Sequence, residues 1–331
     1  MSTMRAIVYN SYGSPDVLQC QEVEKPTAGD GQVLVKVRAA SVNPLDWHYM
    51  RGTPYLVRMG TGLRRPKDAR LGVDVAGQVE TVGRNVTQFR PGDEVFGVAR
   101  GAFAEYVSAS ETKLALKPAN LSFEQAASVP IAAFTALQGL RDKGRIQSGQ
   151  KVLINGAAGG VGTFAVQIAK AFGAEVTGVC STRNVEMVRS IGADHVIDYT
   201  RGDFIRSGQL YGLILDSAGN HSLSDLRRVL TPEGTLVLVG GPDKGHWLGP
   251  LADVLEAVVL SRFVSQKILP FLAHSSKDDL IVMKELLETG KVTPVIDRSY
   301  SLRDVPDAIR YLEEGHARGK VVIAVEHDSP A

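Results

Sequence analysis

The sequence has few cysteines, no long apolar run and no long block of one charge, and each shortage argues against a class of protein. The two cysteines, Cys20 and Cys180, lie far apart, so they predict neither a disulfide framework nor a four-cysteine zinc site. We find no apolar run long enough to cross a bilayer and no signal peptide at the start. A net charge of +1 argues against nucleic acid as the main partner. We therefore expect a cytoplasmic protein with no membrane partner.

The composition is otherwise ordinary for a folded protein. The chain has 331 residues, of which 44% are hydrophobic and 22% are charged. This length is enough for two domains, each with a sizeable core.

One stretch combines a strand, a glycine turn and a helix. Residues 151–155 have the pattern of a short buried strand, and apolar residues recur at helical spacing from Val161 to Phe172, until Gly173 ends the helix. Glycines let the chain turn sharply and let the backbone approach a pyrophosphate, while a helix N-terminus attracts anions. We therefore predict a dinucleotide site whose contacts come from Gly156, Ala158, Gly159, Gly160, Val161 and Gly162.

The strand that follows, 175–180, completes a β-α-β unit and indicates which dinucleotide binds. NAD-selective sites usually have an acidic residue at the end of this strand, but the chain continues with Ser181, Thr182 and Arg183 and has no carboxylate before Glu186. Hydroxyls and a guanidinium suit a 2′-phosphate, which favours NADPH over NADH. The alternative is that Arg183 is a solvated residue at a helix start.

Residues 1 to about 120 have a mostly β pattern, punctuated by glycine and proline, that is typical of a small irregular barrel. The expected strands are 5–9, 33–38, 78–82, 93–96 and 104–107. The long segment 47–72 carries several basic residues, and we interpret it either as a mobile loop near a cleft or as a plain solvated loop. Ser122 and Gln125 match a capping box, which predicts a helix start. A second helix follows Pro130.

From residue 151 onward, strands alternate with helices, which predicts a parallel sheet covered on both faces. The expected strands are 151–155, 175–180, 195–197, 213–216 and 235–239, with 263–264 as one more. Ligands of such sheets bind beyond the carboxyl ends of the strands. The small-residue turns 216–219 and 239–241 lie at two such ends, so we expect Ala218 and Gly240 to contact the cofactor.

After about residue 270 the pattern predicts a helix over 277–289, a short strand, a helix over 303–316 and a final strand over 321–325. A cofactor domain does not need this tail, so the simplest arrangement returns it to the first domain. We place the catalytic domain at 1–125 and 270–331 and the cofactor domain at 126–269. The site is then expected in the cleft between them.

Seven segments spread over the chain carry a family likeness: 41–46 (SVNPLD), 72–77 (GVDVAG), 91–97 (PGDEVFG), 104–106 (AEY), 157–162 (AAGGVG), 192–199 (GADHVIDY) and 319–322 (GKVV). Together they resemble the medium-chain dehydrogenase/reductase superfamily, in its zinc-independent quinone oxidoreductase branch, which includes zeta-crystallin-like enzymes. The resemblance implies an α/β fold, in which a GroES-like β-barrel catalytic domain receives an inserted Rossmann domain. It also implies NADPH-dependent reduction and a homodimer joined through edge strands. By motif position, it adds Thr135, Ser181, Arg183, Tyr199 and Lys320 to the cofactor contacts.

A catalytic zinc is not expected. Zinc-dependent relatives need a cysteine where this chain has Asn43, and a Gly-His-Glu segment where it has Gly72, Val73 and Asp74. Zinc takes about four nitrogen, sulfur or oxygen ligands, and the sequence has no such set.

Without a metal there is no strong Lewis acid, so the expected acceptors are already activated: quinones and α,β-unsaturated carbonyls. Hydride transfer places charge on an oxygen, which hydrogen-bond donors stabilise. The candidate catalytic donors are Asn43, which the resemblance places beside the nicotinamide, and Tyr49. Asn43 is otherwise a loop residue bonding its own backbone. His48 is an alternative proton donor, and Asp46 is expected to order the loop.

Two other functions remain open at this point. The basic residues between Arg58 and Arg70 suit a phosphate-bearing thioester, which indicates an enoyl-thioester reductase on the same fold. The other is a crystallin-like protein that binds NADPH with little turnover.

Overall fold

The computed structural model describes residues 2–239 and 265–327, which form two compact units. Unit 1 comprises 1–131, 275–288 and 294–331, and unit 2 comprises 132–274 and 289–293. The chain therefore leaves unit 1 a few residues later than the sequence analysis places the change, and it returns to unit 2 briefly at 289–293. Gly240 and the expected strand 263–264 lie outside the described residues.

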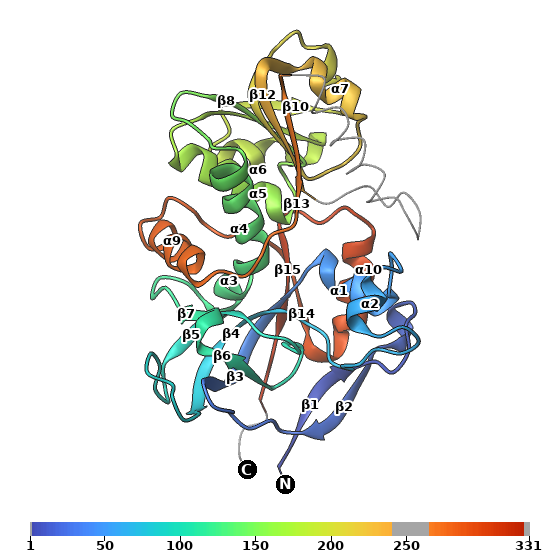
Figure 1. Ribbon diagram of the computed structural model, residues 1–331, viewed down its shortest axis with the longest axis vertical. Coiled ribbons are helices and arrows are strands. Elements are labelled where there is room, and N and C mark those ends of the chain that lie inside the picture. Colours follow the sequence, from blue (N-terminus) through green and yellow to red (C-terminus); the bar gives the residue numbers. More distant parts are fainter. Residues whose placement is uncertain (1, 240–264, 328–331) are drawn as a thin grey trace. The chain divides into compact units, whose positions relative to one another are not determined.

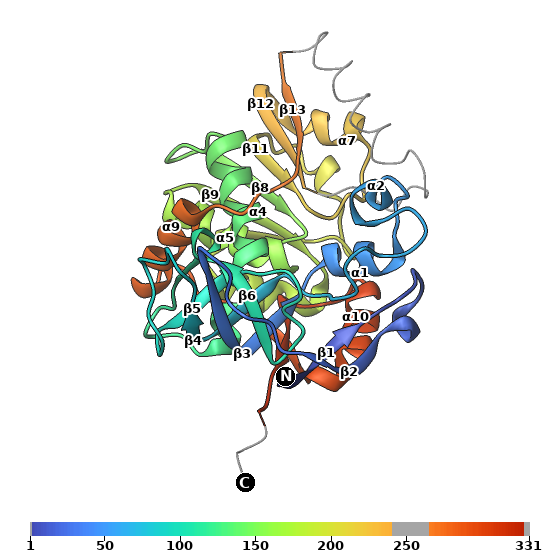
Figure 2. The same cartoon turned by 60° about the horizontal axis from the view of Figure 1, so that its bottom comes forward.

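Unit 2 is built on a six-stranded sheet (Figure 1), whose parallel arrangement was predicted, whereas its sixth strand, Lys267–Phe271, was not. Its strands are β8 (Lys151–Asn155), β9 (Glu175–Cys180), β10 (His195–Asp198), β11 (Tyr211–Asp216), β12 (Leu230–Val239) and β13 (Lys267–Phe271). The spatial order is β10-β9-β8-β11-β12-β13. β8, the first of these strands along the chain, lies in the middle; β9 and β10 follow on one side of it, and β11, β12 and β13 follow on the other. This is the strand order of the Rossmann fold, and its ligand crevice is expected where the order reverses. Figure 2 shows β12 and β13 side by side at one end of the sheet.

Helices connect these strands and cover the sheet. They are α4 (Pro130–Leu137), which begins at the end of unit 1, α5 (Gly160–Ala171), α6 (Val185–Ser190) and α7 (Leu223–Arg228). A π-helical segment, Gln138–Lys143, extends α4. Helix α5 is buried along almost its whole length, from Gly162 to Ala169, because a helix between a parallel sheet and its neighbours has little polar surface to expose.

Unit 1 is mainly β, as predicted. Its strands are β1 (Thr3–Val8), β2 (Gln19–Glu24), β3 (Gln32–Val42), β4 (Asp74–Val82), β5 (Glu94–Val98), β6 (Tyr106–Ser110), β7 (Leu114–Leu116), β14 (Ile296–Ser301) and β15 (Lys320–Ala324). β14, β15, β3, β4, β5 and β7 pair in that order, β6 adds to β3, and β1 and β2 form a separate pair. Its helices are α1 (Pro44–Arg51), α2 (Val57–Thr61), α3 (Phe123–Ala127), α9 (Lys277–Glu288) and α10 (Val305–Glu313).

The C-terminal tail is part of the unit 1 sheet. β15 pairs antiparallel with β3, with Val321 opposite Val42, and Figure 1 shows the red strand β15 beside the blue strand β3. This pairing brings the start of β15 to the end of β3, although about 280 residues separate them in the chain. The end of β3 is in turn paired with the start of β4, where Ser41 lies opposite Asp74.

The interpretation of 47–72 as an irregular loop is wrong over two stretches, which form α1 and α2. Asn43 is the N-cap of α1: its backbone N–H donates to Asp46 Oδ2 at 2.8 Å, and Pro44 occupies the first helical position. Asn-Pro-Leu-Asp is therefore a helix start, because a short polar residue caps the helix, proline suits its first turn and an acidic side chain reaches back. The helix ends at Gly52, whose φ is 60°.

The capping box at Ser122 is confirmed. The Ser122 N–H donates to Gln125 Oε1 at 2.9 Å, and the Gln125 N–H donates to Ser122 Oγ at 3.2 Å. Among the described residues, no helix has the length and apolarity needed to cross a membrane.

Candidate functional site

The turn after β8 has room for glycine alone at two positions. Gly156 has a φ of 85°, a left-handed conformation that side chains disfavour. A Cβ added to Gly162 would lie 2.1 Å from the carbonyl oxygen of Gly156 and 2.8 Å from Ala157. These two glycines therefore let the turn close on itself, as the sequence analysis expects for a tight strand-to-helix connection.

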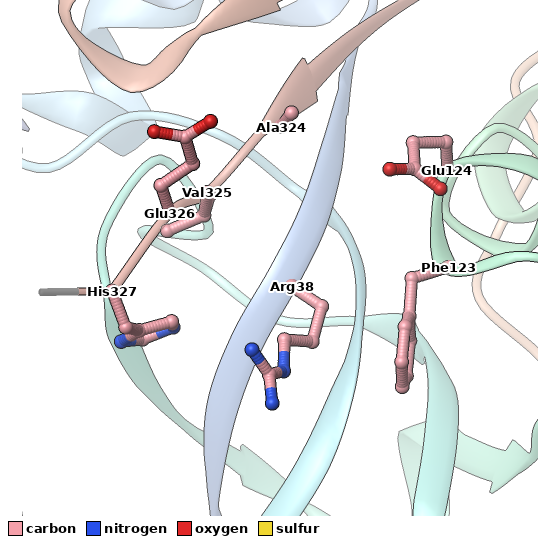
Figure 3. Close-up of a pocket in the computed structure, with 7 residues that line it drawn as sticks. All are labelled: Arg38, Phe123, Glu124, Ala324, Val325, Glu326 and His327. Carbon is pink, nitrogen blue, oxygen red and sulfur yellow. The ribbon is translucent and has the colours of Figure 1, made fainter. Parts of the chain in front are cut away.

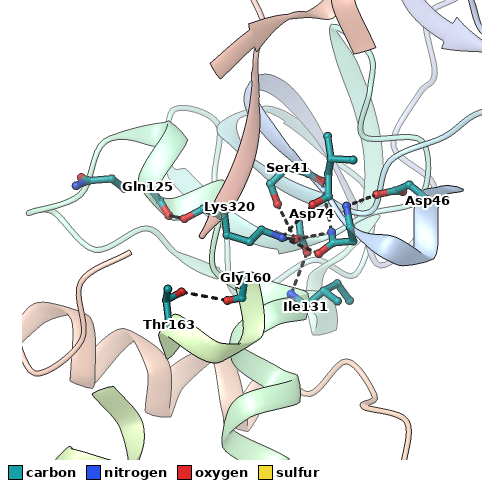
Figure 4. Close-up of polar contacts among 11 residues, drawn as sticks. Ser41, Asp46, Asp74, Gln125, Ile131, Gly160, Thr163 and Lys320 are labelled. Atoms are coloured by element: carbon teal, nitrogen blue, oxygen red, sulfur yellow. Dashed lines mark hydrogen bonds and ion pairs between the residues drawn. The ribbon is translucent and has the colours of Figure 1, made fainter. Parts of the chain in front are cut away.

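The outer side of the same turn is open. A Cβ added to Gly159 would meet only the Gly156 oxygen, at 3.4 Å, which is ordinary contact. Helix α5 begins at Gly160. Within its first turn, the Thr163 hydroxyl donates a hydrogen bond to the Gly160 carbonyl at 3.2 Å (Figure 4). The first N–H groups of a helix have no partner within it. The turn thus has the backbone donors and the empty space that a phosphate needs.

Asp216 orders the neighbouring strand end. Its Oδ1 accepts the side-chain N–H of Asn155 at 2.9 Å and the backbone N–H groups of Ala218 and Gly219 at 3.1 Å each. The ends of β8 and β11 are therefore tied together at the reversal of strand order. The predicted contact Ala218 lies beside the predicted glycine turn for this reason: an added Cβ on Gly156 would lie 3.4 Å from the Ala218 nitrogen.

A second group of predicted contacts gathers where β9 and β10 end. The Tyr199 N–H donates to the Cys180 carbonyl at 3.0 Å, which places Tyr199 beside the segment that starts with Ser181. Arg183 is exposed in the short turn Thr182–Asn184. Sequence reasoning missed Asp198 here: it accepts the Thr182 hydroxyl at 2.6 Å, and this hydrogen bond lowers the pKa of its carboxyl. Because the Thr182 hydroxyl donates to Asp198, Ser181 and Arg183 are the better candidates for a phosphate.

The other predicted contacts are more scattered. Thr135 is buried in α4, and Gly240 lies outside the described residues. Lys320 belongs to unit 1.

Unit 1 contains a cluster of buried polar side chains at the joined ends of β3, β4 and β15 (Figure 4). The residues of this buried polar cluster are Ser41, Asn43, Asp46, Asp74 and Lys320, and each is at most 3% exposed. Buried charges are costly unless they are paired. The charges of this cluster must therefore be balanced by contacts within the protein.

The Lys320 ammonium is held entirely by protein oxygens. Its Nζ donates to Asn43 Oδ1 at 2.6 Å, to the Val42 carbonyl at 3.2 Å and to Asp74 Oδ2 at 3.5 Å. An ammonium has three donors, so these contacts account for all of them. Burial is the largest cause that lowers the pKa of Lys320, and Asp74 opposes it.

Asn43 is fixed in one orientation by its neighbours. Lysine can only donate, so the amide oxygen of Asn43 must face Lys320. The amide nitrogen then donates to Asp74 Oδ2 at 2.8 Å and approaches the Ser41 carbonyl at 3.4 Å. This differs from the expectation that Asn43 offers an N–H to the acceptor oxygen, because both amide hydrogens face protein oxygens.

Asp74 is the most heavily bonded acceptor of the cluster. Besides Asn43 and Lys320, it receives the Ser41 hydroxyl at 2.8 Å on Oδ2 and the Ile131 N–H at 3.0 Å on Oδ1. It therefore connects β3 and β4 to the start of α4.

Asp46 is the second buried carboxyl, and it is held differently. Its Oδ2 accepts the Asn43 N–H, whereas its Oδ1 has no hydrogen-bond partner among the described residues. Burial raises the pKa of Asp46 to about 7, and the nearby Asp74 adds to the rise. The expectation that Asp46 orders its segment agrees with this bond, and its carboxyl also binds a proton far more readily than an exposed one does.

The aromatic residues of α1 follow in the same helix, after the residues that begin it. Tyr49 is half-buried and packs against the unit 1 core. The His48 ring lies at a centroid distance of 3.7 Å from Trp47, and its Nδ1 is 2.7 Å from the Thr53 carbonyl. Because a carbonyl only accepts, Nδ1 carries a hydrogen.

These residues do not fit a zinc ion. No group of three or more histidine, cysteine, aspartate or glutamate side chains suited to a metal occurs within 2–239 and 265–327. At the positions that correspond to zinc ligands, the amide of Asn43 and the carboxylate of Asp74 both contact the Lys320 ammonium. A cation already lies there, and it is part of the chain.

A cavity of about 550 Å³ lies elsewhere on unit 1. It is lined by Arg38, Phe123, Glu124 and the segment from Ala324 to His327 (Figure 3). None of the predicted site residues lines it.

Comparison with known proteins places the chain in a family. Residues 29–119 match the alcohol dehydrogenase GroES-like domain, and residues 191–323 match a family described as zinc-binding dehydrogenase. The 2-methylene-furan-3-one reductase of Solanum lycopersicum is 36% identical over 97% of this chain and 79% of its own length. The chloroplastic NADPH-dependent alkenal/one oxidoreductase of Arabidopsis thaliana is 34% identical over the same shares.

A solved structure indicates the same family. The quinone oxidoreductase of Coxiella burnetii superposes with a TM-score of 0.85 at 30% identity, covering 98% of this chain and all of its own. The predicted fold class, with a GroES-like domain and a Rossmann domain, is thereby confirmed. The chain belongs to the medium-chain dehydrogenase/reductase superfamily, in its quinone oxidoreductase branch.

Proposed function

We propose that this protein is an NADPH-dependent oxidoreductase that reduces quinones or α,β-unsaturated carbonyls without a metal. The observation that carries the proposal is the chemistry at Asn43, where the cation is the ammonium of Lys320 instead of a Lewis-acidic metal. Such a site suits acceptors that are activated before they bind. The names of the relatives support the same substrate class, since two of them are reductases of conjugated carbonyl compounds.

The glycine turn of unit 2 would hold the cofactor. The backbone from Gly156 to Gly162 has the open side and the helix N-terminus that a pyrophosphate requires. Ser181, Arg183 and Tyr199 come together at the ends of β9 and β10, where a ribose 2′-phosphate would be bound. Thr135 and Ala218 remain candidate contacts. A nicotinamide cofactor is supported by the relatives' names, and the preference for NADPH rests on Arg183.

When bound, the cofactor supplies a hydride, which reaches a quinone or the β-carbon of an enone. Negative charge then appears on the acceptor's oxygen. We propose that the Tyr49 phenol donates a hydrogen bond to that oxygen. The Asn43 amide is the poorer candidate, because both of its N–H hydrogens already face protein oxygens. Asn43 keeps a supporting role, since it caps the helix that carries Tyr49.

A screen of NADPH oxidation tests this function. The purified protein would be mixed with NADPH and, separately, with benzoquinones, short enones and saturated ketones of matched size. We expect turnover of the quinones or enones and none of the saturated ketones, with stoichiometric consumption of acceptor. Turnover of saturated ketones with no turnover of activated acceptors would contradict the proposal.

An enoyl-thioester reductase is the second candidate, and one observation favours it. Arg64, Arg65 and Lys67 are exposed, close together in the chain and suited to attract a phosphate-bearing substrate. Crotonyl-CoA belongs in the same screen, with an enone that has no phosphate as its comparison. Saturable NADPH binding without turnover of any acceptor would instead support the crystallin-like alternative.

A homodimer in the cytoplasm completes the proposal. Light scattering after size-exclusion chromatography measures the mass directly, and a monomer at micromolar concentration would contradict the dimer. Fractionation of cells that express the protein would test its compartment.

A further inference from the structure

Three strand ends meet at the buried polar cluster, and the chain is constrained to place Lys320 there. β15 starts at Lys320 beside the end of β3, and β3 is paired with the start of β4. Gly319, immediately before Lys320, has a φ of 96°, and an added Cβ would lie 2.3 Å from the Val295 carbonyl oxygen. The backbone N–H of Lys320 donates to that same oxygen at 2.8 Å. The backbone therefore holds the lysine in place before its side chain makes any contact.

We propose that Lys320 and Asp74 are positioning residues: the fixed ammonium of Lys320, balanced by the Asp74 carboxylate, sets the orientation of Asn43 and, through Asn43, the first turn of α1. The inference deepens the proposed function, because α1 carries Tyr49. It also replaces the expectation that Lys320 contacts the cofactor.

The contacts leave Lys320 no capacity for a phosphate. The side chain is 3% exposed, and its three donors face Val42, Asn43 and Asp74. A lysine that binds a phosphate needs at least one of those donors free. In this arrangement its charge acts on the amide of Asn43 instead.

Asn43 passes this constraint to the helix. Its side chain faces Lys320 and Asp74, while its backbone N–H donates to Asp46 and its carbonyl accepts the Asp46 N–H at 2.9 Å. Rotation of the amide would break the contact with Lys320, because an NH₂ group cannot accept from an ammonium. The orientation of the first turn of α1 thus depends on a pair of charges located on two other strands.

The charge balance of the cluster agrees with the proposed pairing of Lys320 and Asp74. One buried ammonium can neutralise one of the two buried carboxylates. Asp74 contacts the ammonium, and Asp46, which has one oxygen without a partner among the described residues, is left as the carboxyl that holds a proton. Removal of the ammonium alone would leave an uncompensated charge, whereas removal of both charges would not.

Two variants and their combination test the proposal: Lys320→Met, Asp74→Asn and the double variant. For each we would measure the melting temperature, the dissociation constant for NADPH by fluorescence titration, and kcat and KM with the best acceptor, expressed per NADPH-binding site. Lys25→Met is the matched control, because Lys25 forms an ion pair with Glu80 at 2.7 Å in the same unit but outside the cluster.

We expect both single variants to melt at lower temperature than the wild type and the double variant to melt above at least one of them. The kcat of Lys320→Met and of the double variant should fall about 10- to 100-fold, as for a small misplacement of a catalytic group. The NADPH dissociation constant should stay within about twofold, and Lys25→Met should leave kcat unchanged.

Two results would overturn the proposal. A rise of about tenfold or more in the NADPH dissociation constant of Lys320→Met, with kcat unchanged, would make Lys320 a cofactor contact. Recovery of kcat in the double variant would make the pair purely structural. If Lys320→Met does not fold, the double variant, which has no unpaired charge, decides the question by itself.

Failure of the proposed function would be recognised separately. If the wild type reduces no acceptor, the proposed function fails, and crystal structures of the wild type and the double variant still test the positioning. A turned Asn43 amide or a displaced first turn of α1 in the double variant supports the proposal, and an unchanged Asn43 refutes it.

Discussion

The two units build their candidate sites from opposite materials. Unit 2 offers a turn of glycines and small residues, in which backbone N–H groups would bind the phosphates of the proposed cofactor. Unit 1 offers a cluster of fully buried charged and amide side chains, in which almost no backbone is exposed. The glycine turn depends on side chains being absent, whereas the buried polar cluster depends on several polar side chains contacting one another. A substitution is therefore expected to damage the first by adding bulk and the second by removing a charge.

The contrast also concerns how far apart the participants lie in the chain. The glycine turn is complete within seven residues, 156–162. The buried polar cluster draws on β3, α1, β4 and β15, and it forms only when the final strand pairs with β3. Local geometry governs the first site, and long-range pairing governs the second.

The largest effect is expected from bulk in the glycine turn. Gly162→Ala would place a methyl 2.1 Å from the Gly156 oxygen, so we expect it to disrupt the turn and to abolish measurable NADPH binding. Gly159→Ala is the informative partner, since its methyl meets nothing closer than 3.4 Å in the protein. We expect Gly159→Ala to melt like the wild type and to bind NADPH at least about tenfold more weakly, because the open side must stay open for phosphate. Unchanged NADPH affinity in Gly159→Ala would mean that the ligand does not approach this side.

A charge reversal at the strand ends is expected to have the next largest effect. Arg183→Glu should raise the KM for NADPH about 10- to 100-fold and change the KM for NADH by less than about twofold, because the guanidinium meets only the extra phosphate. Arg189→Glu is the control: Arg189 is also an exposed arginine of unit 2, it lies in α6 outside the turn Thr182–Asn184, and it forms an ion pair with Glu186 at 2.8 Å. Equal effects of Arg183→Glu on both cofactors would remove the argument for a 2′-phosphate.

A smaller effect, on stability, is expected from the buried carboxyl of unit 1. The pKa of Asp46 is about 7 in the folded protein and close to its ordinary value of 3.8 when the chain is unfolded, so the folded state binds the proton more tightly. The contribution of Asp46 to the free energy of unfolding is therefore fully present below about pH 4, is lost as the pH rises to about 7, and is constant above that. Asp46→Asn, which resembles the protonated acid, should lack this loss.

Urea unfolding of the wild type and Asp46→Asn between pH 4.5 and 8.5 measures the difference. The variant should gain stability relative to the wild type as the pH rises, by about 4 kcal/mol at most over the whole range. A difference that does not change with pH would show that Asp46 is ionised throughout.

Chelation of metal ions is expected to have no effect. Prolonged dialysis against EDTA should leave the reductase activity unchanged, because the cation beside Asn43 is Lys320. Loss of activity in EDTA that added zinc restores would contradict a metal-free mechanism.

The sequence predicted the structure of the Rossmann unit more completely than that of the barrel unit, for a physical reason. Periodicity of apolar residues and the glycine spacing describe a β-α-β unit within about thirty residues. The turn and every strand of this sheet except β13 were predicted in this way. Asn43 was singled out from the sequence as well, but as a donor to the acceptor, since nothing local shows that its amide hydrogens face Asp74 and Ser41. The helix start at Asn43 was visible in Asn-Pro-Leu-Asp and was missed, and with it the structure of α1.

Asp198 and Asp74 illustrate what was out of reach. Asp198 follows a predicted strand, yet its contact with Thr182 depends on β9 and β10 being neighbours in the sheet. Asp74 was noted as part of a family segment and as a position that lacks the zinc ligands of relatives, without a role of its own. Its four partners are Ser41 of β3, Asn43 at the start of α1, Ile131 of α4 and Lys320 of β15, none of which is near it in the chain.

The amino-acid sequence by itself determined the turn that can bind a nucleotide, because glycine conformations and helix N-termini are properties of adjacent residues. It also determined the family, because several short segments keep their order and spacing. Only the tertiary structure decided which way the Asn43 amide faces and which oxygens Lys320 contacts. The direction of a hydrogen bond and the balance of buried charges depend on which strands lie side by side, and strand pairing is settled only when distant parts of the chain meet.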